Sequence, residues 1–185
     1  MHARALAGWP RWGAGFGVDA EKRVDAGLTD ARFWDVLQSS PLPEALHAQL
    51  ATLGDGDLLD FERRHAELHA EAYDWGLWGA AYVLHGGCSD DTFVDFRAYL
   101  LSLGRDVYES ARADPDSLAY VSRDAAGETW EDWTSPTMHV IHQRTGQWAF
   151  AGSPPTSPLR PTGEEWQEES DELARRFPRL TAAYA

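Results

Sequence analysis

The sequence contains a single cysteine, Cys88, in 185 residues. A lone thiol excludes an intramolecular disulfide and a cysteine-based zinc cluster. Long apolar runs are also lacking, since the longest (WGAAYVL, residues 78–84) is far shorter than the roughly 20 residues that cross a bilayer. Pro10 and Arg11 interrupt the apolar N-terminal stretch. We therefore expect no membrane span, no signal peptide and a cytoplasmic location.

Basic residues are few compared with acidic ones. The chain has 16 Lys and Arg residues against 30 Asp and Glu residues, which gives a formal net charge of −14. Such a surface repels nucleic acids and anionic membranes on average, so we expect neither as a partner. A basic protein is the partner that this charge favours.

The remaining composition is that of a globular protein, with 43% hydrophobic and 25% charged residues. Residues 1–28 contain Pro10 and a high density of glycine, which opposes both helix and strand, so they predict a flexible arm. No segment alternates for long with period two. Residues 29–185 therefore predict an all-α, single compact domain of five to seven helices around a long central helix.

Capping residues and apolar spacing locate these helices. Thr29 or Asp30 precedes the first, Pro43 opens the second, and Ser89 precedes a later one that carries Asp90 and Asp91 in its first turn. The central helix is expected over residues 57–85, with one apolar face along its whole length. Its Gly79 and Ala80 would let another helix approach closely. Further helices are expected over residues 105–113, from Pro136 to about 146, and over 163–177 with Thr162 as cap.

Nine tryptophans are present. The expected inward-facing positions are Trp34, Trp75, Trp78 and Trp166. Three others, Trp130, Trp133 and Trp148, lie in a weakly patterned region, where exposed aromatic residues beside acidic ones often mark a contact surface.

Three segments carry a family resemblance. They are FWDVL (residues 33–37), AYDWGLWGAAYVLHGGCSDDTFVDFRAYLLSLGRDVYESARADPDSL (72–118) and PTGEEWQEESDELARRFPRL (161–180). Their order and spacing resemble the bacterial domain-of-unknown-function family numbered 4240, over roughly residues 30–180. Residues 125–152 depart from the family pattern. The resemblance implies a shared fold, and it assigns no catalytic residue.

A group of polar residues forms the candidate ligand-binding site. His65 and His69 are four residues apart on one helix, so both rings could reach one ligand, with Tyr73 on the same side. The metalloprotease motif requires Glu directly after the first histidine, where this chain has Ala66. A core histidine and a surface histidine are the alternative interpretation, and no metal or cofactor is expected. The complete candidate pocket, between the third and fourth expected helices, is His65, His69, Tyr73, Asp90, Asp91 and Arg97.

Two functions remain open. The first is a binding or regulatory module that recognises a basic partner, for example in the manner of an antitoxin or immunity protein. The second is an enzyme or small-ligand-binding protein that uses the pocket above, and a metal-dependent enzyme is one form of this alternative. Catalytic residues stay unassigned. Cys88 is expected to be incidental, because Asp90 and Asp91 oppose the thiolate form that a nucleophile needs.

Overall fold

The computed structural model describes residues 27–121, 130–149, 151, 158–167 and 171–184. The predicted arm lies outside this part of the chain except for its last two residues. Within these ranges the chain forms nine α-helices and short 3-10 helices, and no β-strand. The predicted all-α class is confirmed, with more and shorter helices than the five to seven expected. The bounds are α1 Asp30–Gln38, α2 Pro43–Leu50, α3 Asp55–Glu71, α4 Trp75–His85, α5 Asp90–Ser102, α6 Arg105–Ala113, η2 Pro115–Tyr120, η4 Trp130–Trp133, α7 Pro136–Thr145, α8 Glu172–Arg176 and α9 Pro178–Tyr184.

Several helix starts follow directly from capping chemistry. The Thr29 side chain accepts a hydrogen bond from the backbone N–H of Arg32, and Ser89 accepts one from Thr92, so each satisfies a donor at the start of its helix. Pro43 and Pro136 occupy first-turn positions of α2 and α7, where their missing N–H costs nothing. These four starts agree with the sequence predictions.

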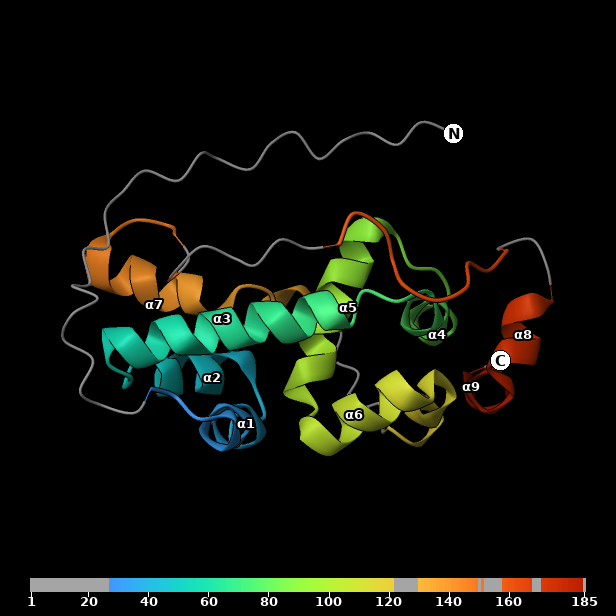
Figure 1. The fold of residues 1–185 in the computed structure, drawn as a ribbon, viewed down its shortest axis with the longest axis horizontal. Coiled ribbons are helices and arrows are strands. Elements are labelled where there is room, and N and C mark those ends of the chain that lie inside the picture. Colours follow the sequence, from blue (N-terminus) through green and yellow to red (C-terminus); the bar gives the residue numbers. More distant parts are fainter. Residues whose placement is uncertain (1–26, 122–129, 150, 152–157, 168–170, 185) are drawn as a thin grey trace.

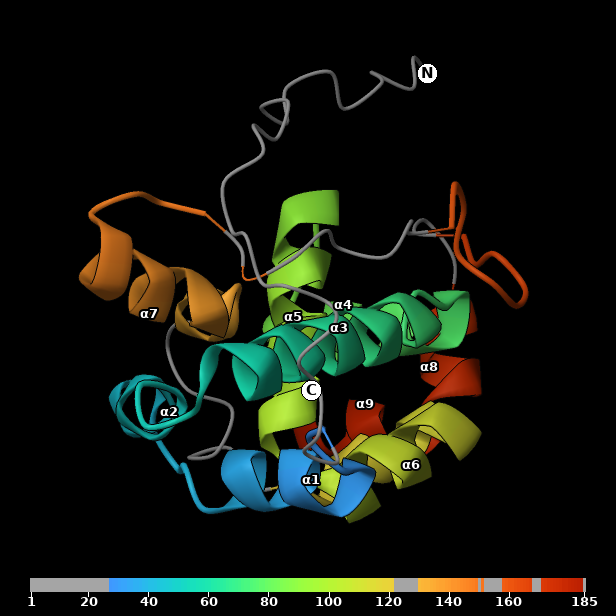
Figure 2. The same ribbon diagram turned by 60° about the vertical axis from the view of Figure 1, so that its left-hand side comes forward.

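The helices are arranged around α3 and α5. Figure 1 shows α3, the longest helix at 17 residues, running through one half of the molecule, with α5 crossing it steeply. Figure 2 shows the same crossing, with α1 and α6 on one side of α3 and α7 on the other. Helix α5 contacts α1, α3, α4, α6 and η4. Helix α7 packs on α2, and α4 packs on α8 and α9.

The prediction of one helix over residues 57–85 is wrong. Helix α3 ends at Glu71, and α4 begins at Trp75 after a turn in which Asp74 is extended. The Asp74 side chain accepts hydrogen bonds from the N–H groups of Gly76 and Leu77, so it caps a new helix. The apolar spacing continues across the turn, which is why periodicity alone concealed the break.

Thr162 closes this break from a distant part of the sequence. Its N–H donates to the carbonyl of Tyr73 at 2.9 Å, and its carbonyl accepts from the N–H of Trp75 at 2.9 Å. Its hydroxyl donates to the Asp74 carboxylate at 2.8 Å. The prediction of a helix over residues 163–177 is wrong in its first part, because residues 164–167 are not helical. Among the described residues of that range, only Glu172–Arg176 forms a helix.

The core runs through the whole described part of the chain. Leu58, Phe61, His65 and Leu68 of α3 and Ala72 of the following turn are buried, as the predicted apolar face requires. Asp60 and Glu62 of α3 are buried as well, which the prediction did not include. Gly79 of α4 also behaves as predicted, since a Cβ built there would lie 2.7 Å from the Phe177 ring. The described part of the chain contains no helix long and apolar enough to cross a membrane.

The tryptophans divide differently from the prediction. Trp34 is buried as expected, whereas Trp75, Trp78 and Trp166 are only partly buried. Trp130 is buried rather than exposed, because its ring lies against Phe96 and Tyr99 of α5. Trp148 is exposed.

Candidate functional site

Four of the six predicted site residues come together where α3 ends. The rings of His65 and His69 are stacked with centroids 6.1 Å apart. The Arg97 guanidinium of α5 lies 4.7 Å from the centre of the Tyr73 ring and 5.2 Å from that of Phe93. The fold therefore brings His65, His69, Tyr73 and Arg97 into one cluster, which we call the α3-end cluster.

Arg97 is the charged member of this cluster, and only 5% of its surface is exposed. Its Nη1 donates to the carbonyl of His69 at 3.0 Å, and its Nε donates to the carbonyl of Phe93 at 3.3 Å. No carboxylate of the described residues forms an ion pair with it. The C-terminal carbonyls of a helix carry partial negative charge and lack partners within the helix, so Arg97 compensates the end of α3.

Tyr108 also donates to a carbonyl at the end of α3, that of the residue before His69. Its hydroxyl donates to the carbonyl of Leu68 at 2.7 Å. The N–H of Tyr73 donates to the carbonyl of Ala70 at 3.1 Å. Side chains from α5 and α6 thus complete the end of α3, and the α3-end cluster has a structural role that the sequence pattern did not reveal.

Burial keeps both histidines of the cluster neutral. Loss of hydration lowers the pKa of His65 to about 4 and that of His69 to about 3, where the nearby positive charge of Arg97 acts in the same direction. A ring nitrogen of His69 lies 2.9 Å from the carbonyl of Val94. Burial also lowers the pKa of Arg97, to about 10, so the guanidinium stays charged at neutral pH.

Asp90 and Asp91 do not share this cluster's buried surroundings. Both are exposed in the first turn of α5. Arg97 lies about two helical turns further along, or roughly 10 Å of rise. Their position fits the favourable interaction of carboxylates with a helix N-terminus. The predicted six-residue pocket is thus divided between a buried cluster and an exposed acidic turn.

Sequence reasoning gave little weight to Glu62, although its side chain is buried in α3 with 4% exposure. The hydroxyl of Thr137 in α7 donates a short hydrogen bond to its carboxylate. Burial raises the pKa of Glu62, and the hydrogen bond from Thr137 opposes this only in part. In the sequence, the signal that could have identified Glu62 was its position among the core-facing residues of this helix, where a charged side chain is unusual.

Two further observations concern chemistry at this end of the molecule. Loss of hydration, together with the negative charges of Asp90 and Asp95, raises the pKa of the Cys88 thiol to about 12. A thiol in such surroundings is a poor nucleophile.

Over the described ranges, no group of three or more His, Cys, Asp or Glu side chains is arranged to hold a metal ion.

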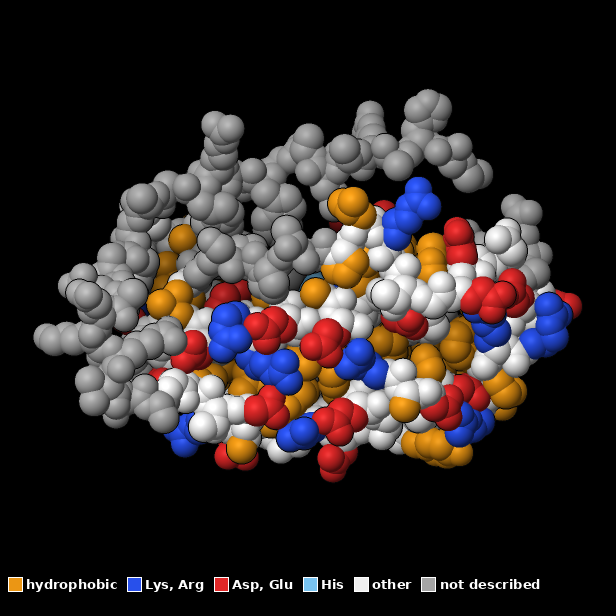
Figure 3. All heavy atoms as spheres, viewed as in Figure 1, with side chains coloured by type: hydrophobic (Ala, Val, Ile, Leu, Met, Phe, Trp, Pro, Cys, Tyr) orange, Lys and Arg blue, Asp and Glu red, His pale blue; other side chains and the backbone are white. Residues whose placement is uncertain are grey.

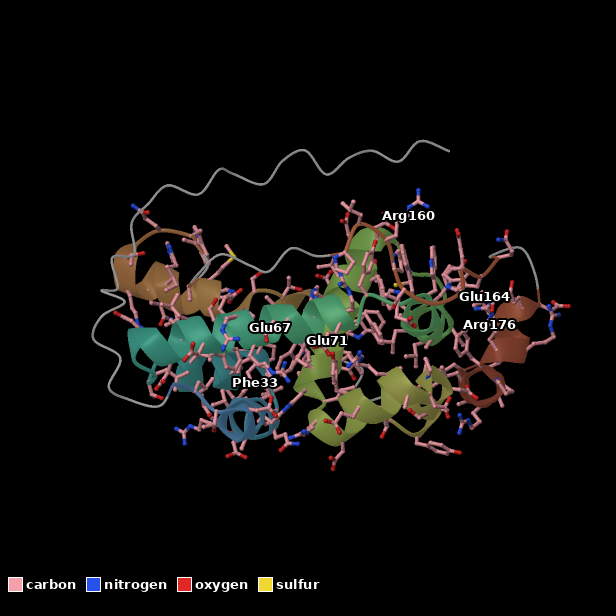
Figure 4. The ribbon with its side chains drawn as sticks, viewed as in Figure 1. Phe33, Glu67, Glu71, Arg160, Glu164 and Arg176 are labelled. Atoms are coloured by element: carbon pink, nitrogen blue, oxygen red, sulfur yellow. The ribbon has the colours of Figure 1, made fainter. Side chains whose placement is uncertain are left out.

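The outer surface shows how charges are distributed. Figure 3 shows acidic and basic side chains interleaved over the face that carries α3 and α6. Arg64 and Arg105 both contact Asp30, and Arg63 contacts Glu67 at 2.8 Å. Glu67 and Glu71 follow one another along α3 in Figure 4. Glu71 pairs with Arg112, also at 2.8 Å. On this face the positive charges are largely neutralised within the molecule.

The fold and this cluster define an all-α domain in which polar side chains complete interrupted helices. The family model described as "Protein of unknown function (DUF4240)" matches residues 28–144, more than half of the chain. The chain belongs to this family, as its sequence resemblance indicated. No curated protein and no solved structure was found to match it.

Proposed function

We propose that this protein is a binding module whose acidic surface recognises a basic protein partner. The observation that carries the proposal is the formal net charge of −14, together with the way charges pair on the surface. Most arginines of the described residues already contact a carboxylate of the same chain. The excess negative charge is therefore available to an external cation.

The N-terminal half of α5 is the surface that we assign to this contact. Asp90, Asp91 and Asp95 lie within six residues, and none of them forms an ion pair with a cation of the described residues. Asp95 accepts a hydrogen bond from the hydroxyl of Thr134 at 2.8 Å, which fixes its position. Helix α5 packs on η4, so these carboxylates project from a well-supported element.

A small-ligand-binding or enzymatic function at the α3-end cluster is the second candidate. Arg97 favours it, because a buried guanidinium without a carboxylate partner among the described residues could bind an anion. The guanidinium already donates hydrogen bonds to the carbonyls of His69 in α3 and Phe93 in α5, and Asp90 and Asp91 lie outside the cluster. We therefore prefer the binding module.

The test is capture of a partner from a lysate of the source cells on the immobilised full chain. We expect a protein with a basic isoelectric point to be retained at low salt and released at about 0.5 M salt, because screening weakens contacts between exposed charges. Its purified complex should show the same salt dependence by calorimetry. A partner bound independently of salt, or no specific partner, contradicts the proposal.

A pair of matched variants locates the surface. Asp90→Asn, Asp91→Asn and Asp95→Asn together should weaken binding at least about tenfold, since three facing charges are lost. The control changes Asp35→Asn, Asp106→Asn and Glu165→Gln, three exposed acids elsewhere, and alters the net charge equally. Equal weakening by both sets would contradict the assignment to α5.

A further inference from the structure

Two large aromatic side chains are strongly exposed in the described residues: Tyr120, at 77%, and Trp148, at 58%. They differ in their surroundings. The guanidinium of Arg179 lies 5.7 Å from the centre of the Tyr120 ring, so Tyr120 already has a cation from its own chain. No Lys or Arg of the described residues lies over the ring of Trp148.

Histidines hold Trp148 in place. Its ring is stacked on that of His142 with centroids 4.0 Å apart and an angle of 6° between the planes. His139 meets it edge-on at 5.3 Å and is itself stacked on His47 of α2 at 4.1 Å. One face of the indole is therefore covered by the protein, and the exposed area belongs to the rest of the ring.

Helix α7, which carries two of these histidines, is firmly attached to the core. Arg144 donates to the Asp55 carboxylate at 2.6 Å and to the carbonyl of Leu53 at 2.7 Å. Near the other end of the helix, Thr137 donates to the buried Glu62. Trp148 is thus an exposed aromatic ring on a rigid support. An interface residue that is ordered before binding loses little conformational entropy when the partner arrives.

Resting on the function proposed above, we propose that Trp148, beside α2 and α7, is a second contact point for the basic partner, in addition to the α5 carboxylates, and accepts an arginine side chain of that partner on its open face. Tryptophan is the aromatic side chain that attracts a cation most strongly, and the planar guanidinium also stacks on it. Tryptophan is also enriched among the few residues that dominate binding energy. The net negative charge of the chain makes a cationic group the favoured occupant, ahead of an acidic or neutral one.

The probe for this test is a fluorescein-labelled octa-arginine peptide, with binding to the full chain followed by anisotropy over a range of salt concentrations. Trp148→Ala should raise the Kd about 3- to 30-fold, the range expected for loss of one cation–π contact. The slope of log Kd against log salt should stay unchanged, because no charge is removed. Tyr120→Ala is the matched control and should leave the Kd within about twofold. An octa-lysine peptide should lose less affinity than octa-arginine in Trp148→Ala.

The outcomes separate the two proposals. If wild type and Trp148→Ala bind octa-arginine equally, the contact at Trp148 is refuted while recognition of basic partners stands. An equal loss for octa-lysine and octa-arginine overturns the assignment to arginine. If no form of the protein binds either peptide, or if binding ignores salt, the proposed function itself fails. Circular dichroism of Trp148→Ala confirms its folding, and His142→Phe, which retains a stacking ring, should preserve binding.

Discussion

Buried ionisable side chains are concentrated in α3, where Glu62 and His65 lie in the core beside Phe61. Burial raises the pKa of Glu62 and lowers that of His65 to about 4, whereas the guanidinium of Arg97 donates a hydrogen bond to the carbonyl of His69 near the end of α3. Such groups resemble a catalytic site in the sequence because residue type and spacing do not show what surrounds them. The prediction that His65 and His69 share a face was sound. The partner of His69, the carbonyl of Val94 in α5, depends on packing that the sequence pattern does not contain.

Replacement of Glu62 tests this interpretation. The fold raises the pKa of Glu62, so its stability contribution is complete below the unfolded pKa and is lost as pH rises. Glu62→Gln keeps an acceptor for Thr137 without the buried charge. We expect it to increase the free energy of unfolding by about 1–3 kcal/mol at pH 8 and much less at pH 4.5. Urea unfolding at both pH values measures the difference. The exposed Glu44→Gln serves as control, and a Glu62→Gln effect that does not depend on pH would contradict the assignment.

The contribution of His65 to stability should depend on pH in the opposite direction to that of Glu62. The pKa of His65 is lowered in the fold, so its contribution is present above pH 6.5 and is lost as pH falls toward about 4. We expect wild type to lose roughly 1–3 kcal/mol more than His65→Leu between pH 7.5 and pH 4.5. Chemical denaturation at the two pH values provides the comparison. Parallel pH profiles for the two proteins would show that His65 is not buried in its neutral form.

Among the helices, those bounded by strong local signals were predicted well. Thr29, Ser89 and Pro136 each act on their own turn, so the sequence contains their whole effect. The break at Asp74 was missed because its capping signal competes with an uninterrupted apolar spacing. Thr162 stabilises this break, and its contacts could not be inferred from the sequence around Asp74. The same remote contact explains why the segment after Thr162 does not continue as a helix.

The packing of α4 on α8 and α9 depends on the absence of a side chain at Gly79. A Cβ there would approach Phe177 to 2.7 Å and Leu173 to 3.1 Å. Gly79→Ala should therefore destabilise the protein by about 1–3 kcal/mol, despite alanine's higher helix propensity. Gly56→Ala in α3, where nothing lies within 4 Å of the new Cβ, should be neutral or slightly stabilising. Thermal unfolding of both variants is the measurement, and equal melting temperatures would contradict the predicted close contact.

In the molecule as a whole, the family match ends at an earlier residue than the packed core does. The match ends at residue 144, yet residues after it contribute to the core. Leu173, Phe177 and Leu180 are buried, and Phe177 and Leu173 pack closely on α4. The described domain therefore includes its C-terminal helices.

Truncation tests whether those helices are required. Each buried Leu or Phe that is lost costs about 2–5 kcal/mol, so removing three approaches the entire stability of a typical domain. We expect a chain ending at residue 149 to lose its cooperative unfolding transition in circular dichroism and to bind ANS. Truncation only after residue 181, which retains all three, should preserve the transition. A cooperative transition in the shorter chain would show that α8 and α9 are dispensable.

The contact between Thr162 and Tyr73 joins residues 89 positions apart, and this separation has a consequence during protein synthesis. A ribosome adds roughly 5–20 residues per second, so Tyr73 waits roughly 4–18 s for its partner to be made. Helices form within microseconds. In the living cell the rate of translation therefore sets the time of the last step in assembling the α3–α4 junction. Until then, water must form the hydrogen bonds with the backbone groups that Thr162 later contacts.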